Sequence, residues 1–187
     1  MDSTDILLTL YSIIAGLGIE RLVQGLASLI EQRRHVRLYW VHSAWLFLTM
    51  TAHVVTIFAL IRFTSSPHWT VFNAMLTLSM PLLLYLISDL MVPTIGESGS
   101  VDLRSYFYAT RRWFYSLMIA LALCGMAVQV AIEREIDMSR AGLLRVLAVL
   151  ALAVGLASRR PAVQSTVIVV LLALVASGAT LISVELM

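Results

Sequence analysis

The stretch that decides the fold is residues 6–30, ILLTLYSIIAGLGIERLVQGLASLI, whose only charged side chains are Glu20 and Arg21. A transmembrane helix needs about 20 mostly apolar residues, because the hydrocarbon core of a bilayer is about 30 Å thick. A membrane β-barrel would instead show alternating strands of about ten residues, and an unpaired backbone is too costly in lipid. The stretch therefore predicts a membrane-spanning helix.

Five further apolar runs follow, and most charged residues lie between them. The chain has 187 residues, of which 60% are hydrophobic and 13% charged, whereas about a quarter of the residues of a soluble domain are charged. A water-soluble globule is excluded, and we expect no nucleic-acid partner. We predict an all-α polytopic membrane protein with one transmembrane domain over residues 1–187. Its six spans are residues 6–30, 39–61, 70–92, 113–132, 141–157 and 162–184.

The distribution of arginine predicts the orientation of these spans. The first, third and fifth loops hold Arg33, Arg34, Arg37, Arg104, Arg111, Arg112, Arg159 and Arg160. The opposite side holds Arg62, Arg134 and Arg140. Because cytoplasmic loops are enriched in basic residues, we expect the odd loops in the cytoplasm and both termini outside, in the periplasm if the membrane is a bacterial inner membrane.

The third loop ends in a segment that mixes arginines with aromatic residues. We expect residues 102–112 to form an interfacial helix that leads into the fourth span. An ordinary membrane anchor explains this composition, and a site for anionic lipid headgroups is the alternative. The residues at this interface are Arg104, Arg111, Arg112 and Trp113.

The first span has a smooth face and a polar face. At about 100° per residue, Gly18 and Gly25 lie within about 20° of each other, whereas Glu20 and Gln24 lie about 200° and 240° around from Gly18. Small residues let helices approach closely, so we predict that Gly18 and Gly25 mark a helix-packing seam.

Glu20 and Arg21 place two charges inside this span. A charge deep in the bilayer costs about 2.5–3.5 kcal/mol on insertion scales, and such groups usually pair inside the bundle. We therefore expect both side chains to face protein or a cavity, with Asp89 or His42 as their nearest partners.

The second span carries a polar stripe on one helical face, formed by His42, Trp45, Thr49, His53 and Thr56. Together with neighbouring spans this stripe predicts two polar layers. The cytoplasmic layer holds Glu20, Arg21, Gln24, His42 and Asp89, and the outer layer holds His53, Asn73 and Arg145. Pro81 should kink the third span, where Thr77 and Ser88 can line the opening. Histidines and carboxylates relay protons, so the layers favour a path for protons, ions or a small polar solute. In the alternative interpretation these groups satisfy one another and fix the register of the helices.

A haem or catalytic site is not supported by the pattern. His42 and His53 are about 16 Å apart on one helix and cannot clamp one iron, so haem would need a partner chain or methionine ligation. Cys124 is the single cysteine, which excludes an intramolecular disulfide. The chain has no nucleophile elbow, zinc-protease motif or P-loop, so the sequence does not support enzymatic activity, and we predict no cofactor.

Three segments, residues 12–26, 37–45 and 102–114, resemble a group of uncharacterised small bacterial membrane proteins. The resemblance implies a bacterial inner-membrane location and no particular activity. It covers the first two thirds of the chain.

The leading hypothesis is a conduit or transporter-like protein for protons, ions or a small polar solute near the first three spans. The first alternative is an accessory or scaffold membrane subunit without transport activity. The second is a membrane haem or lipid-binding protein. The expected partners are the lipid bilayer with its anionic headgroups and either a second copy of the chain or another membrane subunit.

Overall fold

The computed structural model describes residues 3–63, 70–93, 100–134 and 138–185 and is 87% helical. In chain order the elements are α1 (Ser3–Glu31), β1 (Val36–Arg37), α2 (Trp40–Phe63), α3 (Val71–Met91), β2 (Val101–Asp102), α4 (Leu103–Glu133), α5 (Arg140–Ala157) and α6 (Pro161–Glu185). All six helices are long and apolar enough to cross a membrane. The predicted all-α architecture with six candidate spans is confirmed, and the chain is a multi-pass membrane protein.

The predicted span boundaries agree with five helices to within about three residues, and the exception is α4. This helix begins at Leu103, ten residues before the predicted start at 113. Its 31 residues extend for about 46 Å, more than a bilayer core requires. The segment expected as a separate interfacial helix is thus the first part of α4.

Local chemistry explains the early start of α4. Asp102 is the N-cap, and its carboxylate accepts hydrogen bonds from the Arg104 amide at 3.0 Å and from the Ser105 hydroxyl at 2.7 Å. Phe107, one turn further on, is fully buried. The segment is therefore packed into the protein rather than laid along the membrane surface.

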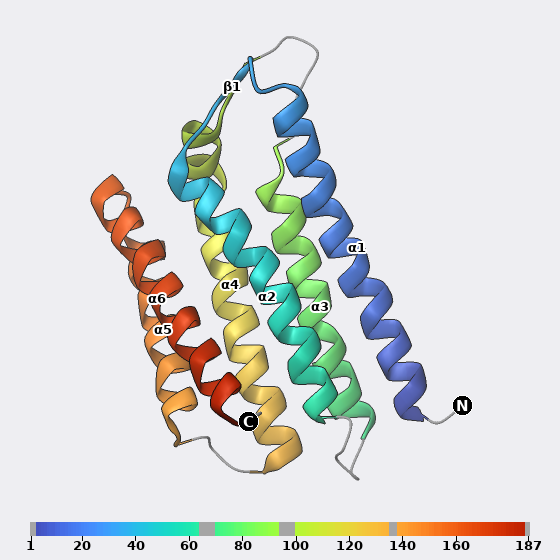
Figure 1. Ribbon diagram of the computed structural model, residues 1–187. Helices are drawn as coiled ribbons and strands as arrows, with labels where there is room; N and C mark the ends of the chain where they lie inside the picture. The colour runs from blue at the N-terminus through green and yellow to red at the C-terminus, as the bar shows by residue number, and fades with distance from the viewer. Residues whose placement is uncertain (1–2, 64–69, 94–99, 135–137, 186–187) are drawn as a thin grey trace.

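The connections α1–α2, α3–α4 and α5–α6 lie at one end of the bundle, as Figure 1 shows, and the first residues of α1 lie at the other end with the last turn of α6. At the first end, β1 and β2 form a short parallel pair in which Val36 is opposite Val101 and Arg37 is opposite Asp102. This pair joins two loops that are far apart in sequence, so no local pattern predicted it. It holds the starts of α2 and α4 together.

Helix α2 is the central helix and contacts α1, α3, α4 and α6. Within the described residues, α1 packs mainly on α3 and α2 and lies at the edge of the bundle (Figure 1). The core between α2 and α4 is aromatic. The Trp45 ring meets Phe114 edge-on, with centroids 4.7 Å apart, and Tyr115 at 5.5 Å. All three side chains are fully buried, so this cluster fixes α2 against α4.

Candidate functional site

The buried face of α1 is the smooth face. Its buried positions recur every three or four residues and comprise Leu7, Tyr11, Ala15, Gly18, Leu22, Gly25 and Leu29. A Cβ built on Gly18 would stand 2.4 Å from His53 Cε1, and one built on Gly25 would stand 2.2 Å from Val92 Cγ2. Both glycines are therefore needed for the close approach of α1 to its neighbours, which supports the predicted packing seam.

Arg21 and Asp89 link α1 to α3. The Arg21 Nε atom donates to Asp89 Oδ1 at 2.7 Å, and the two side chains are 36% and 54% exposed. Asp89 was one of the two partners expected for Arg21. The pair lies close to the C-terminal end of α3, at the end of the bundle that carries the arginine-rich connections.

Glu20 and Gln24 differ from the prediction, because both are exposed on the outward side of α1. The Gln24 amide donates to Glu20 Oε1 at 2.9 Å, within the same helix. The physical reason is the edge position of α1. Once the glycine seam packs against α3 and α2, no other helix that the structure describes packs on the opposite face. Glu20 therefore does not join His42 in a polar layer.

His42 is fully buried in the first turns of α2, in largely aromatic surroundings. Its ring meets Tyr106 and Phe107 edge-on, with centroids 6.1 and 6.5 Å apart. Neither ring nitrogen has a hydrogen bond of normal geometry within the described ranges, and the backbone of Met91 is a polar group next to the ring. His42 thus has a place in the buried stripe of α2, but no carboxylate bonds to it in the part of the chain that the structure describes.

His53 lies deeper in the bundle and bridges α2 to α3. Its Nε2 atom is 2.9 Å from Ser88 Oγ, and the Ser88 hydroxyl donates to the Leu84 carbonyl at 2.8 Å. The Ser88 hydroxyl donates its single proton to the Leu84 carbonyl, so its oxygen accepts the hydrogen bond from His53. The proton of the neutral imidazole is therefore on Nε2. The Nδ1 atom is then an unprotonated acceptor, and it is buried without a hydrogen-bond partner in the described part of the chain.

Further buried polar groups continue this line away from His53. One turn along α2, the Thr56 hydroxyl donates to the His53 and Ala52 carbonyls and faces the hydroxyl of Tyr11 on α1. On α3, Thr77 precedes Ser88 by 11 residues, so it lies within about 20° of it on the same helical face. Thr77 is buried, as is Asn73 one turn before it, whose amide reaches the Ala131 carbonyl at 3.5 Å.

We call this set the polar column, which runs through the bundle from the arginine-rich end toward the opposite one. Its members are His42, Thr49, His53, Ser88, Thr56, Tyr11, Thr77 and Asn73. Thr49 lies between His42 and His53 along α2. Its hydroxyl donates to the Trp45 carbonyl of the same helix at 2.9 Å.

Arg111 departs from the predicted headgroup role, because its side chain is only 2% exposed. The Nη1 atom donates to the carbonyls of Gly155 at 2.7 Å, Leu156 at 3.0 Å and Ser158. These carbonyls are among the last ones of α5, which have no partner within the helix. A cation at this end also complements the helix dipole, so Arg111 caps α5 from inside the protein.

Two residues that the sequence reasoning missed complete this cap. Gln164 of α6 donates to the Gly155 carbonyl at 2.9 Å and to the Ser158 carbonyl at 2.6 Å. The Tyr115 hydroxyl donates to Gln164 Oε1 at 2.5 Å. The signal in the sequence that could have indicated this capping role is the position of Gln164, one turn after the start of α6 at Pro161.

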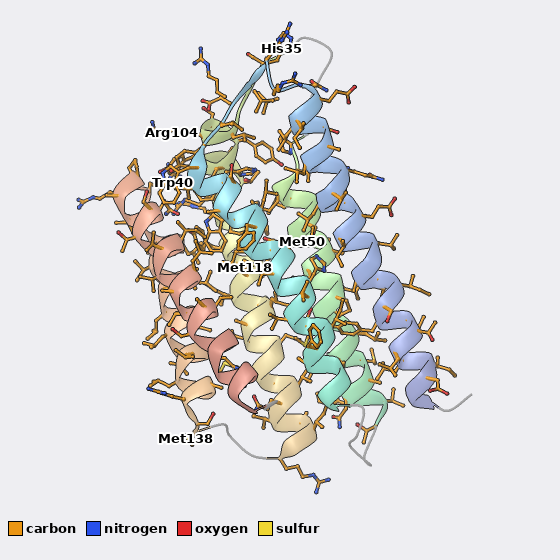
Figure 2. All side chains as sticks on the ribbon, viewed as in Figure 1. His35, Trp40, Met50, Arg104, Met118 and Met138 are labelled. Carbon is orange, nitrogen blue, oxygen red and sulfur yellow. The ribbon has the colours of Figure 1, made fainter. Side chains whose placement is uncertain are left out.

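The other residues expected at the interface are exposed on α4. Arg104 and Arg112 are on the surface, and Trp113 is 72% exposed. Figure 2 shows Arg104 near the arginine-rich end, where Trp40 also lies. This arrangement suits contacts with lipid headgroups.

Arg145 lies away from the polar column, in the first turns of α5, toward the end of the bundle opposite the arginine-rich one. Its Nη1 atom donates to Gln129 Oε1 of α4. Both side chains line a hollow of about 460 Å³ between α4 and α5, together with Arg140 and apolar residues such as Met126 and Leu143. We predicted Arg145 and His53 in one polar layer, but the structure gives them different partners: His53 is bonded to Ser88 and Arg145 to Gln129.

Within the ranges that the structure describes, no group of three or more His, Cys, Asp or Glu side chains is arranged to hold a metal ion. Comparison of the chain with models of protein families, with curated proteins and with solved structures found no match.

Proposed function

We propose that this multi-pass membrane protein conducts protons along the polar column between α1, α2 and α3. The observation that carries the proposal is His53, a fully buried imidazole whose donor nitrogen is bound to Ser88 and whose acceptor nitrogen faces the interior. Buried polar atoms without partners are costly, so their presence in a line across the bundle calls for a functional explanation.

Protons are the cargo that fits these side chains best. The column holds hydroxyls, an amide and two imidazoles, and it holds no carboxylate among its described members. A metal cation would favour oxygen ligands with negative charge. Glu20 faces outward and Asp89 is bound to Arg21, so neither supplies such a ligand. Histidine is the side chain that changes charge near neutral pH.

The directions of the hydrogen bonds at His53 and Ser88 define how His53 would transfer a proton. A proton arriving at Nδ1 makes the ring cationic. The Nε2 proton then passes to the Ser88 oxygen as Ser88 gives its own proton to a water in the column, so Ser88 stays a neutral hydroxyl and the ring is left neutral with its proton on Nδ1. A ring flip restores the first tautomer. Tyr11 and Thr56 continue the path on one side and Thr49 and His42 on the other, with water bridging the hydroxyls that are not in contact.

We place the protein in a bacterial inner membrane with its arginine-rich end in the cytoplasm and both termini in the periplasm. The arginine distribution supports this orientation, because eight arginines lie in the α1–α2 and α5–α6 connections and in the first three turns of α4, at one end of the bundle (Figure 1). On this orientation His42 is at the cytoplasmic mouth of the column and Asn73 near the periplasmic one. Arg104, Arg112 and Trp113 then contact anionic headgroups of the inner leaflet.

The experiment is a proton-flux assay in proteoliposomes that contain a pH-sensitive dye and are driven by a potassium diffusion potential. Wild-type protein should acidify or alkalise the lumen faster than empty liposomes. The variant His53→Gln keeps an N–H donor for Ser88 but cannot take up a proton, so the flux should fall to the level of empty liposomes. The variant His35→Gln is the matched control, because His35 is exposed in a connection at the end of the bundle (Figure 2).

Two results would overturn the proposal. One is a wild-type flux no greater than that of empty liposomes, which would favour the accessory or scaffold subunit. The other is an unchanged flux in His53→Gln protein that melts at the wild-type temperature, which would move the path away from the column.

A further inference from the structure

We infer that the outward face of α1 is the surface through which two copies of this chain associate in the membrane. The inference does not depend on proton conduction. It starts from the edge position of α1, whose neighbours α3 and α2 cover only one of its sides. Between Ile13 and Ala27 the exposed residues of the opposite side are apolar except Glu20 and Gln24, and they lie within the candidate span Asp5–Glu31.

One row of exposed positions along the outward face of α1 has the spacing of a helix–helix seam. Its members follow one another at alternating intervals of four and three residues and are Thr9, Ile13, Gly16, Glu20, Val23 and Ala27. This is the spacing by which side chains of two nearly parallel helices interlock. A Cβ built on Gly16 would meet nothing within 4 Å, so the notch beside Glu20 is open. The face therefore has both the shape and the register for a second helix.

Hydrogen-bond complementarity identifies the occupant as a second copy. The Gln24 amide has two N–H groups, and one of them donates to Glu20 Oε1 of the same chain. The Glu20 carboxylate has further lone pairs to accept with. A twofold axis along the membrane normal sets one α1 beside the other, so that Gln24 of each copy can donate to Glu20 of the other. A face that carries both the donor and the acceptor is self-complementary, as an isologous interface requires.

Covering this face also removes an unfavourable exposure. A carboxylate on the lipid side of a span is disfavoured, and polar side chains in spans are usually turned toward another helix. Glu20 is about 16 Å from the end of α1 at Glu31 and about 22 Å from Asp5. Pairing with a second copy gives both Glu20 side chains donors inside the membrane.

Cysteine cross-linking in native membranes tests the contact directly. In a Cys124→Ala background, Ile13→Cys and Ala27→Cys introduce thiols that lie within about 20° of Glu20 on the outward face. Copper-phenanthroline oxidation should join each variant into a dimer of the chain. The controls are Ala15→Cys and Leu22→Cys, whose side chains are buried against the chain's own helices and should stay monomeric.

A second pair of variants separates association from folding. Gly16→Leu fills the open notch, where a Cβ meets nothing within 4 Å, and Glu20→Leu with Gln24→Leu removes the polar pair. Each should lower the cross-linked fraction of the Ala27→Cys protein about tenfold while the melting temperature of the monomer is kept. The half-buried Thr51 of α2, whose hydroxyl bonds its own helix, supplies the control Thr51→Leu, which should leave cross-linking unchanged.

The inference is overturned if Ile13→Cys and Ala27→Cys protein stays monomeric, or if buried and exposed positions cross-link equally. Cross-linking to a different membrane protein at these positions would also overturn it, because the occupant would then be another subunit. A dimer that survives in both Gly16→Leu and the Glu20, Gln24 double variant would place the interface elsewhere. None of these outcomes bears on the proton-flux assay.

Discussion

Gly18 of α1 stands against the imidazole of His53 in α2, so closely that a Cβ on Gly18 would lie 2.4 Å from His53 Cε1 and 3.4 Å from Tyr85 Cα. The nearest atom, Cε1, belongs to the imidazole ring. That ring is held in place by the hydrogen bond between its Nε2 atom and Ser88 Oγ, which are 2.9 Å apart. The imidazole therefore has little room to move aside. The glycine seam and the polar column meet at this one contact.

Gly18→Ala should consequently destabilise the fold by about 1–3 kcal/mol, because overpacking displaces the ring or separates α1 from α2. Unfolding in detergent by heat or SDS measures the change. Gly178→Ala is the matched control in another helix, since a Cβ there would meet nothing within 4 Å. Combining Gly18→Ala with His53→Ala should restore part of the loss. Equal stabilities of Gly18→Ala and Gly178→Ala protein would contradict the contact.

The Arg21–Asp89 salt bridge predicts a modest coupling between α1 and α3. Both side chains are partly exposed, at 36% and 54%, so water or headgroups screen the pair. We expect a double-mutant cycle of Arg21→Gln and Asp89→Asn to give a coupling energy on the order of 1 kcal/mol. The double variant should be more stable than the sum of the single losses implies. Additive effects of the two substitutions would show that the pair contributes nothing.

These contacts show what the sequence of α1 could and could not predict. Residue periodicity placed Gly18 and Gly25 opposite Glu20 and Gln24, and the structure keeps that division. The expectation that charges turn inward was wrong for Glu20, because periodicity does not say whether a helix has neighbours on both sides. Since α1 lies at the edge, the choice of the glycine face for packing forces Glu20 outward.

The same limit applies at the arginine-rich end of the bundle. Composition identified Arg111 and Arg112 as an interfacial pair, and consecutive residues of a helix point about 100° apart. The structure turns Arg111 toward the end of α5 and leaves Arg112 exposed. That difference depends on where α5 ends relative to α4, which is a long-range contact that local sequence does not encode. The sequence did not predict the β1–β2 pair for the same reason, because this pair is also a contact between segments that are far apart in the chain.

Arg111 should be much more important for stability than its neighbour. Arg111→Ala leaves the carbonyls of Gly155 and Leu156 without the guanidinium donor in a buried place, and we expect a loss on the order of 3 kcal/mol. Arg112→Ala should change the free energy of unfolding little, since its side chain is exposed. Thermal unfolding in detergent compares the two variants. A larger loss in Arg112→Ala protein would contradict the capping role of Arg111.

Asp102 should make the start of α4 sensitive to acid. Hydrogen bonds from the Ser105 hydroxyl and the Arg104 amide lower the pKa of the Asp102 carboxyl below its ordinary value of 3.8. The stabilisation is therefore fully present above the ordinary pKa and is lost as the pH falls through the lowered one. Amide hydrogen exchange at Arg104, corrected for the intrinsic rate, should show reduced protection below this range. Asp102→Asn keeps an acceptor at all pH values and should abolish this pH dependence.

The orientation of the bundle can be decided with two exposed residues at its opposite ends, His35 and Met138 (Figure 2). In a Cys124→Ala background, we expect a membrane-impermeant maleimide to label Met138→Cys in intact bacterial cells, because the α4–α5 connection faces the periplasm under the positive-inside rule. His35→Cys, beside Arg33 and Arg34, should react only after the inner membrane is permeabilised. The reverse pattern would invert the assignment and place His42 at the periplasmic mouth of the polar column. Labelling of both positions in intact cells would mean that the two ends are not separated by the membrane, which would contradict the six-span arrangement itself.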